Sequence, residues 1–174
     1  MTKSKLDNTL IIENALSINE CDALIAEYSI EYKTDLVDKY LGYEYTDVLS
    51  ENPILSKLVS ESFAKYLKTY PTLNRTYDKW ALKTWRFKHF PPNHHFSGWH
   101  SEHNSTHPYL ILCCLLYLSD HNCGTEFLAT NEVIQSKKGR LVMFPAFWTH
   151  IHRGQLCPDK KDRYIMSAYV ELLV

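Results

Sequence analysis

The order of the predicted elements indicates an α+β or mainly-β domain, with N-terminal helices packed on one face of a sheet. Helical spacing of apolar residues marks the first half of the chain. From Trp80 onward the pattern changes to short runs of strand-forming residues separated by turn signals. A chain of 174 residues that is 45% hydrophobic is long enough for one domain with a substantial core. We therefore expect a single domain over residues 1–174, with helical support over roughly 1–79 and a β-core over roughly 80–174.

Two helices are expected in the N-terminal half. Ser17 and Glu20 have the spacing of a capping box, which places a helix start directly after the serine. A second helix is expected after Asn52, because Pro53 suits the first helical position. The short apolar run Leu10–Ile12 precedes both helices and is expected to form a strand.

Strand-forming runs occupy the rest of the chain. The central one is continuously apolar, as expected of a strand that is buried on both faces. These runs are Lys83–Phe90, Tyr109–Leu118, Gly124–Leu128, Arg140–Phe144 and Arg163–Leu172.

Charge and cysteine content narrow the class of protein. The net charge is −1 and charges of both signs are interspersed, so neither a nucleic-acid surface nor a polybasic membrane anchor is predicted. The longest apolar run is too short to span a bilayer. The five cysteines are odd in number and form no CxxC pair, so we expect neither a disulfide framework nor a cysteine-type zinc site. A cytoplasmic location is the simplest expectation, and nothing here predicts an oligomeric state.

Three polar residues have the chemistry of a metal site. His100 and Glu102 are two apart, so in an extended segment they share one face. A second histidine, His150, follows another apolar run. Two imidazoles and one carboxylate hold one side of an octahedral metal and leave the other side open, which is the ligand set of non-haem Fe(II) oxygenases. His152 shares the face of His150 and is an alternative ligand, although its expected role is to line the pocket.

A permanent cation follows the three polar residues. Arg163 carries a fork-shaped guanidinium that suits a carboxylate co-substrate. The competing interpretation is that the histidines and the glutamate are unrelated surface residues, since nine histidines make a chance HxE unsurprising. The combination with Arg163 favours the metal site.

On these residues and their order, the chain resembles the 2-oxoglutarate- and Fe(II)-dependent dioxygenases, specifically the prolyl 4-hydroxylase-like branch. The resemblance runs from about Lys83 to Val170, half of the chain. No single piece is specific, but the pieces occur in the order that the family shows. They are Phe87–Pro92, Trp99–Glu102, Leu116–Asp120, Gly124–Phe127, Phe144–Pro145 with His150, and Arg163–Tyr169.

The resemblance implies a double-stranded β-helix (jelly-roll) core and a hydroxylase that consumes 2-oxoglutarate and O₂ and releases succinate and CO₂. It implies that His100, Glu102 and His150 are the catalytic ligands of Fe(II). Ascorbate is a candidate reductant. The residues implied at the far carboxylate of 2-oxoglutarate are Arg163, Tyr117 and Ser167.

Two departures from the family's pattern affect these assignments. Glu102 stands where Asp is commoner, and its extra methylene moves the carboxylate. The segment between His150 and Arg163 is longer than usual, so a loop insertion is expected there. That insertion leaves open that Lys160 or Lys161 anchors the co-substrate in place of Arg163.

A prolyl residue in an extended peptide is the substrate that fits the resemblance best. Free amino acids and other small metabolites remain open. Other classes are a non-catalytic jelly-roll binding module and a hydrolytic metal enzyme, but a hydrolase has no need for Arg163. Trp99 and Trp148 are expected to pack in the core. The segments expected at the mouth of the barrel are Pro91–Ser97, Asn104–Pro108 and Gln155–Lys161.

Overall fold

The computed structural model describes residues 5–29, 43–48, 51–76, 79–83 and 85–173. Within these ranges the strands form two antiparallel sheets. The larger has seven strands, in the order β1-β8-β5-β10-β4-β2, with β3 paired to β10. Its strands are β1 (Leu10–Ile12), β2 (Glu44–Asp47), β3 (Trp80–Leu82), β4 (Arg86–Phe90), β5 (Leu110–Tyr117), β8 (Leu141–Pro145) and β10 (Arg163–Leu172). The smaller sheet has the order β7-β6-β9 and consists of β6 (Gly124–Phe127), β7 (Glu132–Gln135) and β9 (His152–Gly154).

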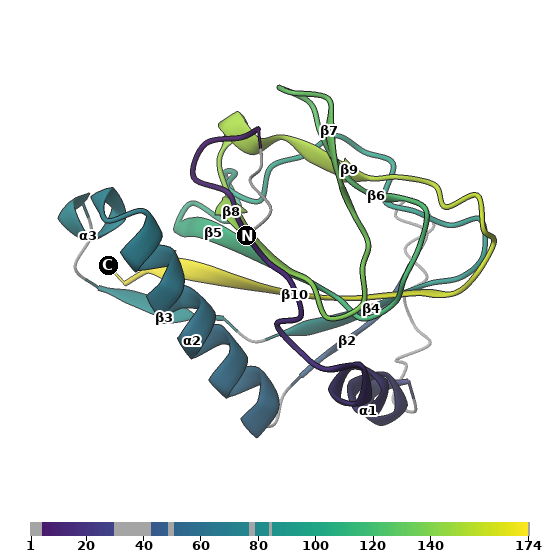
Figure 1. Cartoon of the computed structure of the whole chain (residues 1–174). Helices are drawn as coiled ribbons and strands as arrows, with labels where there is room; N and C mark the ends of the chain where they lie inside the picture. The colour runs from purple at the N-terminus through teal and green to yellow at the C-terminus, as the bar shows by residue number, and fades with distance from the viewer. Residues whose placement is uncertain (1–4, 30–42, 49–50, 77–78, 84, 174) are drawn as a thin grey trace.

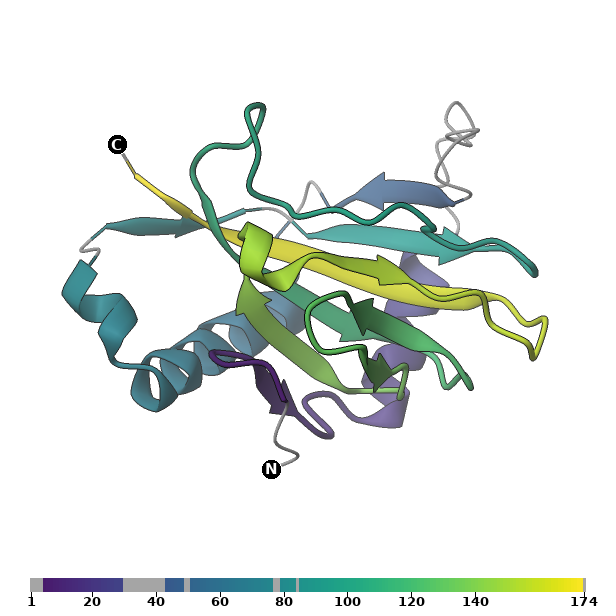
Figure 2. The ribbon, with the colours of Figure 1, turned by 90° about the horizontal axis from the view of Figure 1, so that it is seen from above.

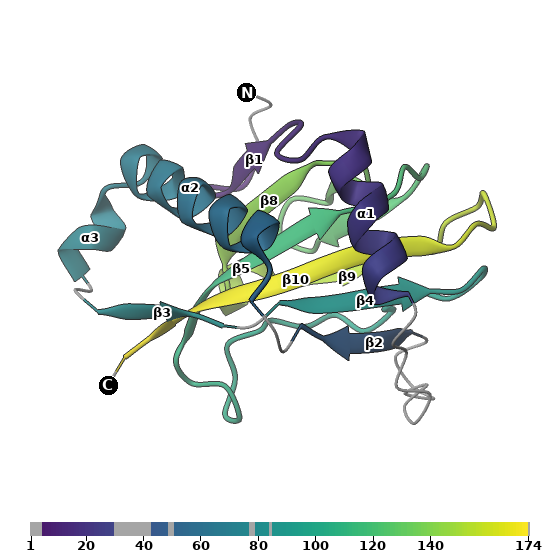
Figure 3. The same cartoon turned by 90° about the horizontal axis from the view of Figure 1, so that it is seen from below.

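The helices and the smaller sheet lie on opposite sides of the larger sheet (Figure 1). Seen from below, α1 (Ile18–Tyr28) and α2 (Pro53–Thr69) cross one face of that sheet (Figure 3). Seen from above, the strands of the smaller sheet lie over β5 and β10 (Figure 2). A short helix α3 (Thr72–Thr76) and a 3₁₀ turn η1 (Trp148–His150) complete the elements. The expected α+β arrangement, with helices on one face of a mainly antiparallel sheet, is confirmed.

Alternation along β10 divides the core into two layers. Met166 and Ala168 pack toward the helices, in one buried cluster with Leu24 of α1 and Leu55 of α2. The intervening residue Ile165 points the other way. Its cluster contains Phe127 and Ile134 of the smaller sheet, together with Tyr117. The odd-numbered residues of β10, which begin with Arg163, therefore face the space between the two sheets.

Both predicted helix starts are confirmed. The Ser17 hydroxyl accepts from the Glu20 amide at 3.3 Å, and the Glu20 carboxylate accepts from the Ser17 amide at 2.8 Å. Asn52 Oδ1 accepts from the amide of Ile54 at 3.1 Å, with Pro53 at the first helical position. These bonds pair amides that a helix leaves without internal acceptors. Among the described residues, every helix is too short or too polar to cross a membrane.

The N-terminal half contributes strands as well as helices. β1 pairs with β8, and β2 pairs with β4, so both belong to the larger sheet. The division expected near residue 79 therefore does not separate helices from strands. The strands β2, β3, β7 and β9 were not predicted; each is only three or four residues long, which is too short to show a clear alternation.

A disulfide joins Cys123 and Cys157, contrary to the expectation from the cysteine count. The two cysteines are 34 residues apart. They meet because β6 pairs with β9, which brings the segment before β6 next to the segment after β9. Spacing along the chain does not reveal such a tertiary contact. The remaining cysteines, Cys21, Cys113 and Cys114, are free and buried.

The free thiols are expected to resist alkylation in the folded protein. Burial raises the pKa of Cys114 to about 12 and that of Cys21 to about 11, so near pH 8 the reactive thiolates are scarce as well as inaccessible. Mass spectrometry after iodoacetamide treatment should find no label on the native chain. Denaturant without reductant should allow three labels, at the three free cysteines. Native labelling of Cys113 or Cys114, or five labels without reductant, would contradict this assignment.

Candidate metal and co-substrate site

The backbone pairs two histidines directly. The His100 amide donates to the His152 carbonyl at 3.0 Å, and the His152 amide donates to the His100 carbonyl at 2.9 Å. Residues opposite one another in an antiparallel pair point their side chains to the same face. The two imidazole rings accordingly lie 4.3 Å apart, centroid to centroid. Glu102, two residues after His100, joins them.

The three side chains present one ligand atom each to a common point. Glu102 Oε1 lies 3.6 Å from His100 Nε2 and 3.8 Å from His152 Nε2, and the three ligand atoms lie within 4.8 Å of one another. Each histidine donates its Nδ1 proton to a backbone carbonyl, that of Gly98 at 3.0 Å and that of His150 at 2.9 Å. These bonds fix the tautomer and leave both Nε2 lone pairs directed at the cluster. Two imidazole nitrogens and one carboxylate oxygen suit Fe(II), and they leave the other side of the metal open to further ligands.

The structure does not bring His150 to this cluster, which corrects the ligand expected from the sequence. His150 Nε2 donates to the Asp7 carbonyl at 3.0 Å, and its Nδ1 lies 2.9 Å from Thr149 Oγ1. The reason is a change of local structure. The strand β8 ends at Pro145 and the chain passes through η1, so the strand that carries the distal histidine is β9, which begins at His152.

Electrostatics hold Glu102 and His152 in the protonation states that metal binding requires. Burial acts to raise the pKa of Glu102, but the hydrogen bond to His100 and the charge of Lys88 outweigh it and lower the pKa to about 2. Burial and the neighbouring His100 lower the pKa of His152 to about 4. At neutral pH the carboxylate is therefore charged and His152 is neutral.

Arg163 extends into a cavity that also contains the cluster. Its side chain is 2% exposed, and Nη1 donates to the Gln155 carbonyl at 3.1 Å. Among the described residues, Nε and Nη2 have no hydrogen-bond partner. Burial lowers the pKa of Arg163 to about 10, so the group stays cationic at neutral pH. Buried donors without acceptors are costly, and a bound carboxylate would satisfy both at once. The cavity is lined by Lys88, Phe90, Phe96, His100, Glu102, Leu115, Thr125, His152, Gly154, Arg163 and Ile165.

The alternative anchors lie elsewhere. Lys160 and Lys161 are exposed, and neither lines this cavity. The insertion that carries them bends back so that its first residue, Gln155, supplies the carbonyl bound by Arg163. Of the three cations considered, Arg163 is the one placed beside the cluster.

Both other expected co-substrate residues are buried, but only Tyr117 contacts a residue of this cavity. The Tyr117 hydroxyl lies 2.7 Å from Thr125 Oγ1, and Thr125 lines the cavity. Burial raises the pKa of Tyr117 to about 12, so the hydroxyl keeps its proton. Ser167 is fully buried, and its hydroxyl has no partner among the described residues. It faces the same way as Arg163 but lies four residues further along β10 and does not line the cavity, so the structure does not bring it to the guanidinium.

Sequence reasoning missed Lys88 as a site residue. The alternation of β4 puts Lys88 on the same face as Phe90, and both line the cavity. Burial lowers the pKa of Lys88, while the nearby Glu102 opposes this effect. The sequence does contain a signal for Lys88. The alternation of its strand places this lysine on the inner face, and a buried lysine requires a partner.

The two tryptophans beside the histidines do not pack in the core as expected. Trp148 is 77% exposed and Trp99 is 39% exposed. The Trp99 ring instead lies under the guanidinium of Arg153, at 4.4 Å from its centroid. Trp99 therefore lies at the surface beside the cluster residue His100, and Trp148 is an exposed residue of η1.

The structure is similar to solved structures of prolyl hydroxylases and of one further 2-oxoglutarate-bound protein. No known protein family and no curated protein matches the chain by sequence. A viral collagen prolyl hydroxylase from Paramecium Bursaria Chlorella virus-1, in complex with 2-oxoglutarate, is 17% identical with a TM-score of 0.76, over 96% of this chain and 97% of that one. A Trichoplax adhaerens prolyl hydroxylase bound to a hypoxia inducible factor peptide is 12% identical with a TM-score of 0.70, over 95% and 84%.

HygX from Streptomyces hygroscopicus, with nickel and 2-oxoglutarate bound, is 9% identical with a TM-score of 0.66, over 95% of this chain and 83% of that one. At these identities the likeness establishes a shared fold.

Proposed function

We propose that this protein is an Fe(II)- and 2-oxoglutarate-dependent dioxygenase that hydroxylates its substrate. The observation that carries the proposal is the pair of unpartnered, buried N–H groups on Arg163, in the same cavity as a two-histidine, one-carboxylate cluster. His100, Glu102 and His152 would hold Fe(II), and the metal would supply the oxidising chemistry. One atom of O₂ converts a substrate C–H to C–OH. The other enters succinate as 2-oxoglutarate loses CO₂.

The chain's own residues bind and orient the co-substrate in this scheme. Arg163 holds the far carboxylate through Nε and Nη2, and the Tyr117 hydroxyl bonds to Thr125, which lines the same cavity. The ring of Phe90 covers the guanidinium at 4.5 Å and keeps water from it. Low exposure strengthens each charged hydrogen bond.

We further propose that residues 1–174 form one domain whose two sheets are the two halves of a double-stranded β-helix. The support is the likeness of fold over almost the whole chain. A prolyl residue of a peptide is the first substrate class to test, because two of the similar structures are prolyl hydroxylases and one holds a peptide. A free amino acid or another small metabolite is the second, favoured by a charged cavity beside Glu102.

Two measurements on the metal-free purified protein test the proposed function. Calorimetry should detect one 2-oxoglutarate bound per chain after Ni(II) is added, and succinate should form once Fe(II), O₂ and a substrate are supplied. Absence of 2-oxoglutarate binding to the metal-loaded protein would reject the oxygenase. It would leave the non-catalytic binding module as the alternative.

A methyl group at Gly154 is expected to weaken co-substrate binding. A Cβ at this position would lie 3.3 Å from Arg163 Nη2 and 3.4 Å from the Phe96 amide, so the guanidinium must shift. Gly154→Ala should raise the KM for 2-oxoglutarate by about fivefold, roughly 1 kcal/mol. Gly98→Ala is the control, since its Cβ would only approach Phe96 at 3.8 Å. Equal KM values in the two variants would argue against close packing of Gly154 on the anchor.

A further inference from the structure

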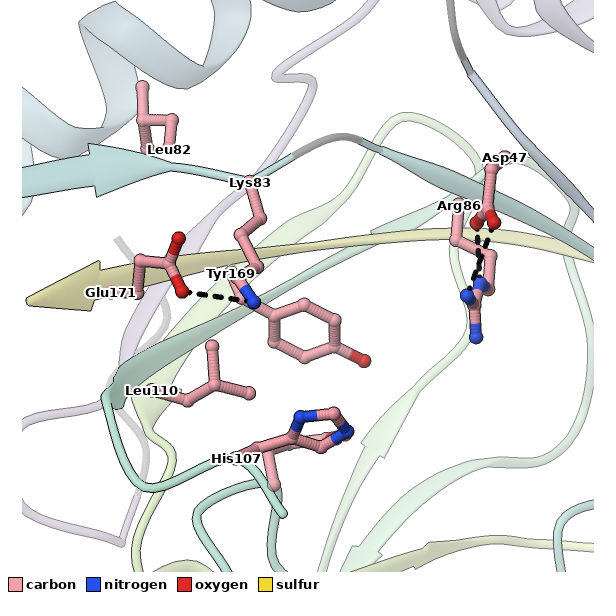
Figure 4. A pocket seen from close by; sticks show the side chains of 9 residues that line it. Asp47, Leu82, Lys83, Arg86, His107, Leu110, Tyr169 and Glu171 are labelled. Carbon is pink, nitrogen blue, oxygen red and sulfur yellow. Dashed lines mark hydrogen bonds and ion pairs between the residues drawn. The ribbon is translucent and has the colours of Figure 1, made fainter.

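A second cavity adjoins the cluster on the side away from Arg163. Its volume of about 540 Å³ is in the range of small-molecule sites. Glu102 lines both cavities, so a ligand in the second one lies next to the proposed metal. The lining residues are Asp47, Leu82, Lys83, Arg86, Glu102, His107, Leu110, Tyr169 and Glu171, and all except Glu102 are labelled in Figure 4.

The walls of this cavity carry charges of both signs. Arg86 and Asp47 face each other across β4 and β2, with Nε to Oδ1 at 2.7 Å and Nη2 to Oδ2 at 3.3 Å. Lys83 Nζ lies 2.9 Å from Glu171 Oε2. In Figure 4 the two ion pairs lie on opposite sides of the Tyr169 ring. Each pair is partly exposed, so a ligand can reach it.

Hydrogen-bonding capacity remains on the Arg86–Asp47 pair. Asp47 occupies Nε and Nη2 of the guanidinium, and within the described part of the chain Nη1 has no partner. An ionised carboxylate accepts up to about four hydrogen bonds, and Asp47 uses two for Arg86. The pair thus offers a donor and an acceptor side by side.

This pair is also the one that lies toward the cluster. Arg86 and Lys88 are two apart on β4 and share a face, and Lys88 lines the Arg163 cavity together with Glu102. On the neighbouring β10, Arg86 pairs with Ser167, two residues from the cavity-lining Ile165, whereas Glu171 lies six residues from Ile165. The Lys83–Glu171 pair therefore forms the more distant wall.

We propose that the substrate is a free α-amino acid, whose carboxylate binds Arg86 Nη1 and whose ammonium binds Asp47. The inference rests on the proposed function and names its substrate class. The two charges of an α-amino acid sit on one carbon, so they match an adjacent cation and anion. The side chain can then extend toward Glu102 and the metal.

A prolyl residue inside a peptide matches this cavity poorly. Its backbone carries no charge at either side of the ring. Its carbonyl can accept from Arg86, but its tertiary amide nitrogen has no hydrogen to donate to Asp47. The remaining acceptor capacity of that carboxylate would be desolvated without a partner, which is costly for a charged group. The cavity chemistry therefore favours a free amino acid over a prolyl peptide as the ligand of this chain.

Succinate formation with Fe(II) and 2-oxoglutarate tests the substrate class. The common free amino acids, including proline, are compared with their N-acetyl and carboxamide derivatives and with a prolyl peptide. At least one free amino acid should raise succinate formation about tenfold above the substrate-free rate, and its capped forms should not. The inference is overturned if capped forms or the prolyl peptide stimulate equally, or if no free amino acid does.

Arg86→Gln and Asp47→Asn test the binding residues. Each should raise the KM for the amino acid about tenfold or more, while the KM for 2-oxoglutarate stays within about twofold. Glu44→Gln is the matched control: Glu44 pairs with His89 at 3.0 Å across the same two strands, on the opposite face. A parallel rise in both KM values, or an equal effect of Glu44→Gln, would show a merely structural role and overturn the assignment.

Calorimetric titration of the same amino acids separates the two proposals. If the protein binds neither metal nor 2-oxoglutarate, the proposed function fails. The titration still decides the inference in that case, because Arg86 and Asp47 are not among the proposed metal ligands. Binding that is lost in Arg86→Gln and kept in Glu44→Gln supports the zwitterion site. No binding of any free amino acid rejects it.

Discussion

His152→Ala should abolish succinate formation and metal binding, while His150→Ala should keep most of both. His152 presents Nε2 to the cluster, 3.8 Å from Glu102 Oε1, whereas His150 Nε2 is bound to the Asp7 carbonyl. Removal of one of three ligands leaves too few protein donors to retain Fe(II) in an open-faced site. Inductively coupled plasma analysis of the dialysed protein measures bound iron directly, beside the succinate assay.

The effect of His150→Ala should appear in stability instead. Loss of the hydrogen bond to Asp7 should lower the free energy of unfolding by about 0.5–1.5 kcal/mol in a denaturant titration. Circular dichroism of His152→Ala checks that the fold persists, which we expect because the apolar layers hold the sheets. The assignment of the distal ligand fails if His150→Ala loses iron and His152→Ala retains it.

The features that could be predicted from the sequence are local ones. The capping box at Ser17 and the Pro53 helix start depend on residues within one turn, and both formed as expected. The placement of His100 and Glu102 on one face follows from their spacing of two. The last strand was predicted with its observed bounds, Arg163–Leu172, because a run rich in strand-forming residues extends over its ten positions.

The distal histidine could not be assigned in this way. Its position depends on a 3₁₀ turn and a three-residue strand, and β9 is a strand only because it pairs with β6 and bridges to His100. Face assignment by alternation fails wherever the chain leaves the extended conformation between two residues. Such pairing is a tertiary property that no local pattern encodes.

The charged cavity has the same tertiary origin. Asp47, Arg86 and Glu171 come from three strands that are distant in the sequence but contiguous in the sheet order β10-β4-β2. Asp47 lies on β2, a strand that was not predicted. From their residue types alone, we would expect these side chains to be solvated surface charges. Register makes Arg86 and Asp47 a cross-strand ion pair, and Glu171 with Lys83 a second pair in the wall of the same cavity.

The second large effect is expected at the anchor. Arg163→Leu should raise the KM for 2-oxoglutarate by about 10- to 100-fold, because charge-assisted hydrogen bonds are typically worth about 1.5–3 kcal/mol. Arg163→Lys should be intermediate, since lysine keeps the charge but loses the fork that presents Nε and Nη2 together. Succinate formation at varied 2-oxoglutarate gives both values. Lys160→Ala and Lys161→Ala are controls, because both lysines are exposed and outside the cavity.

Stability in the absence of co-substrate distinguishes a binding role from a structural one. A buried guanidinium with two unsatisfied donors is costly to the folded state, so Arg163→Leu should be neutral or stabilising by on the order of 1 kcal/mol without 2-oxoglutarate. Addition of 2-oxoglutarate and Ni(II) should then raise the melting temperature of the wild type much more than that of Arg163→Leu. A variant that is strongly destabilised without ligand, yet stabilised by 2-oxoglutarate as much as the wild type, would show that Arg163 supports the fold. Lys160 or Lys161 would then have to bind the carboxylate.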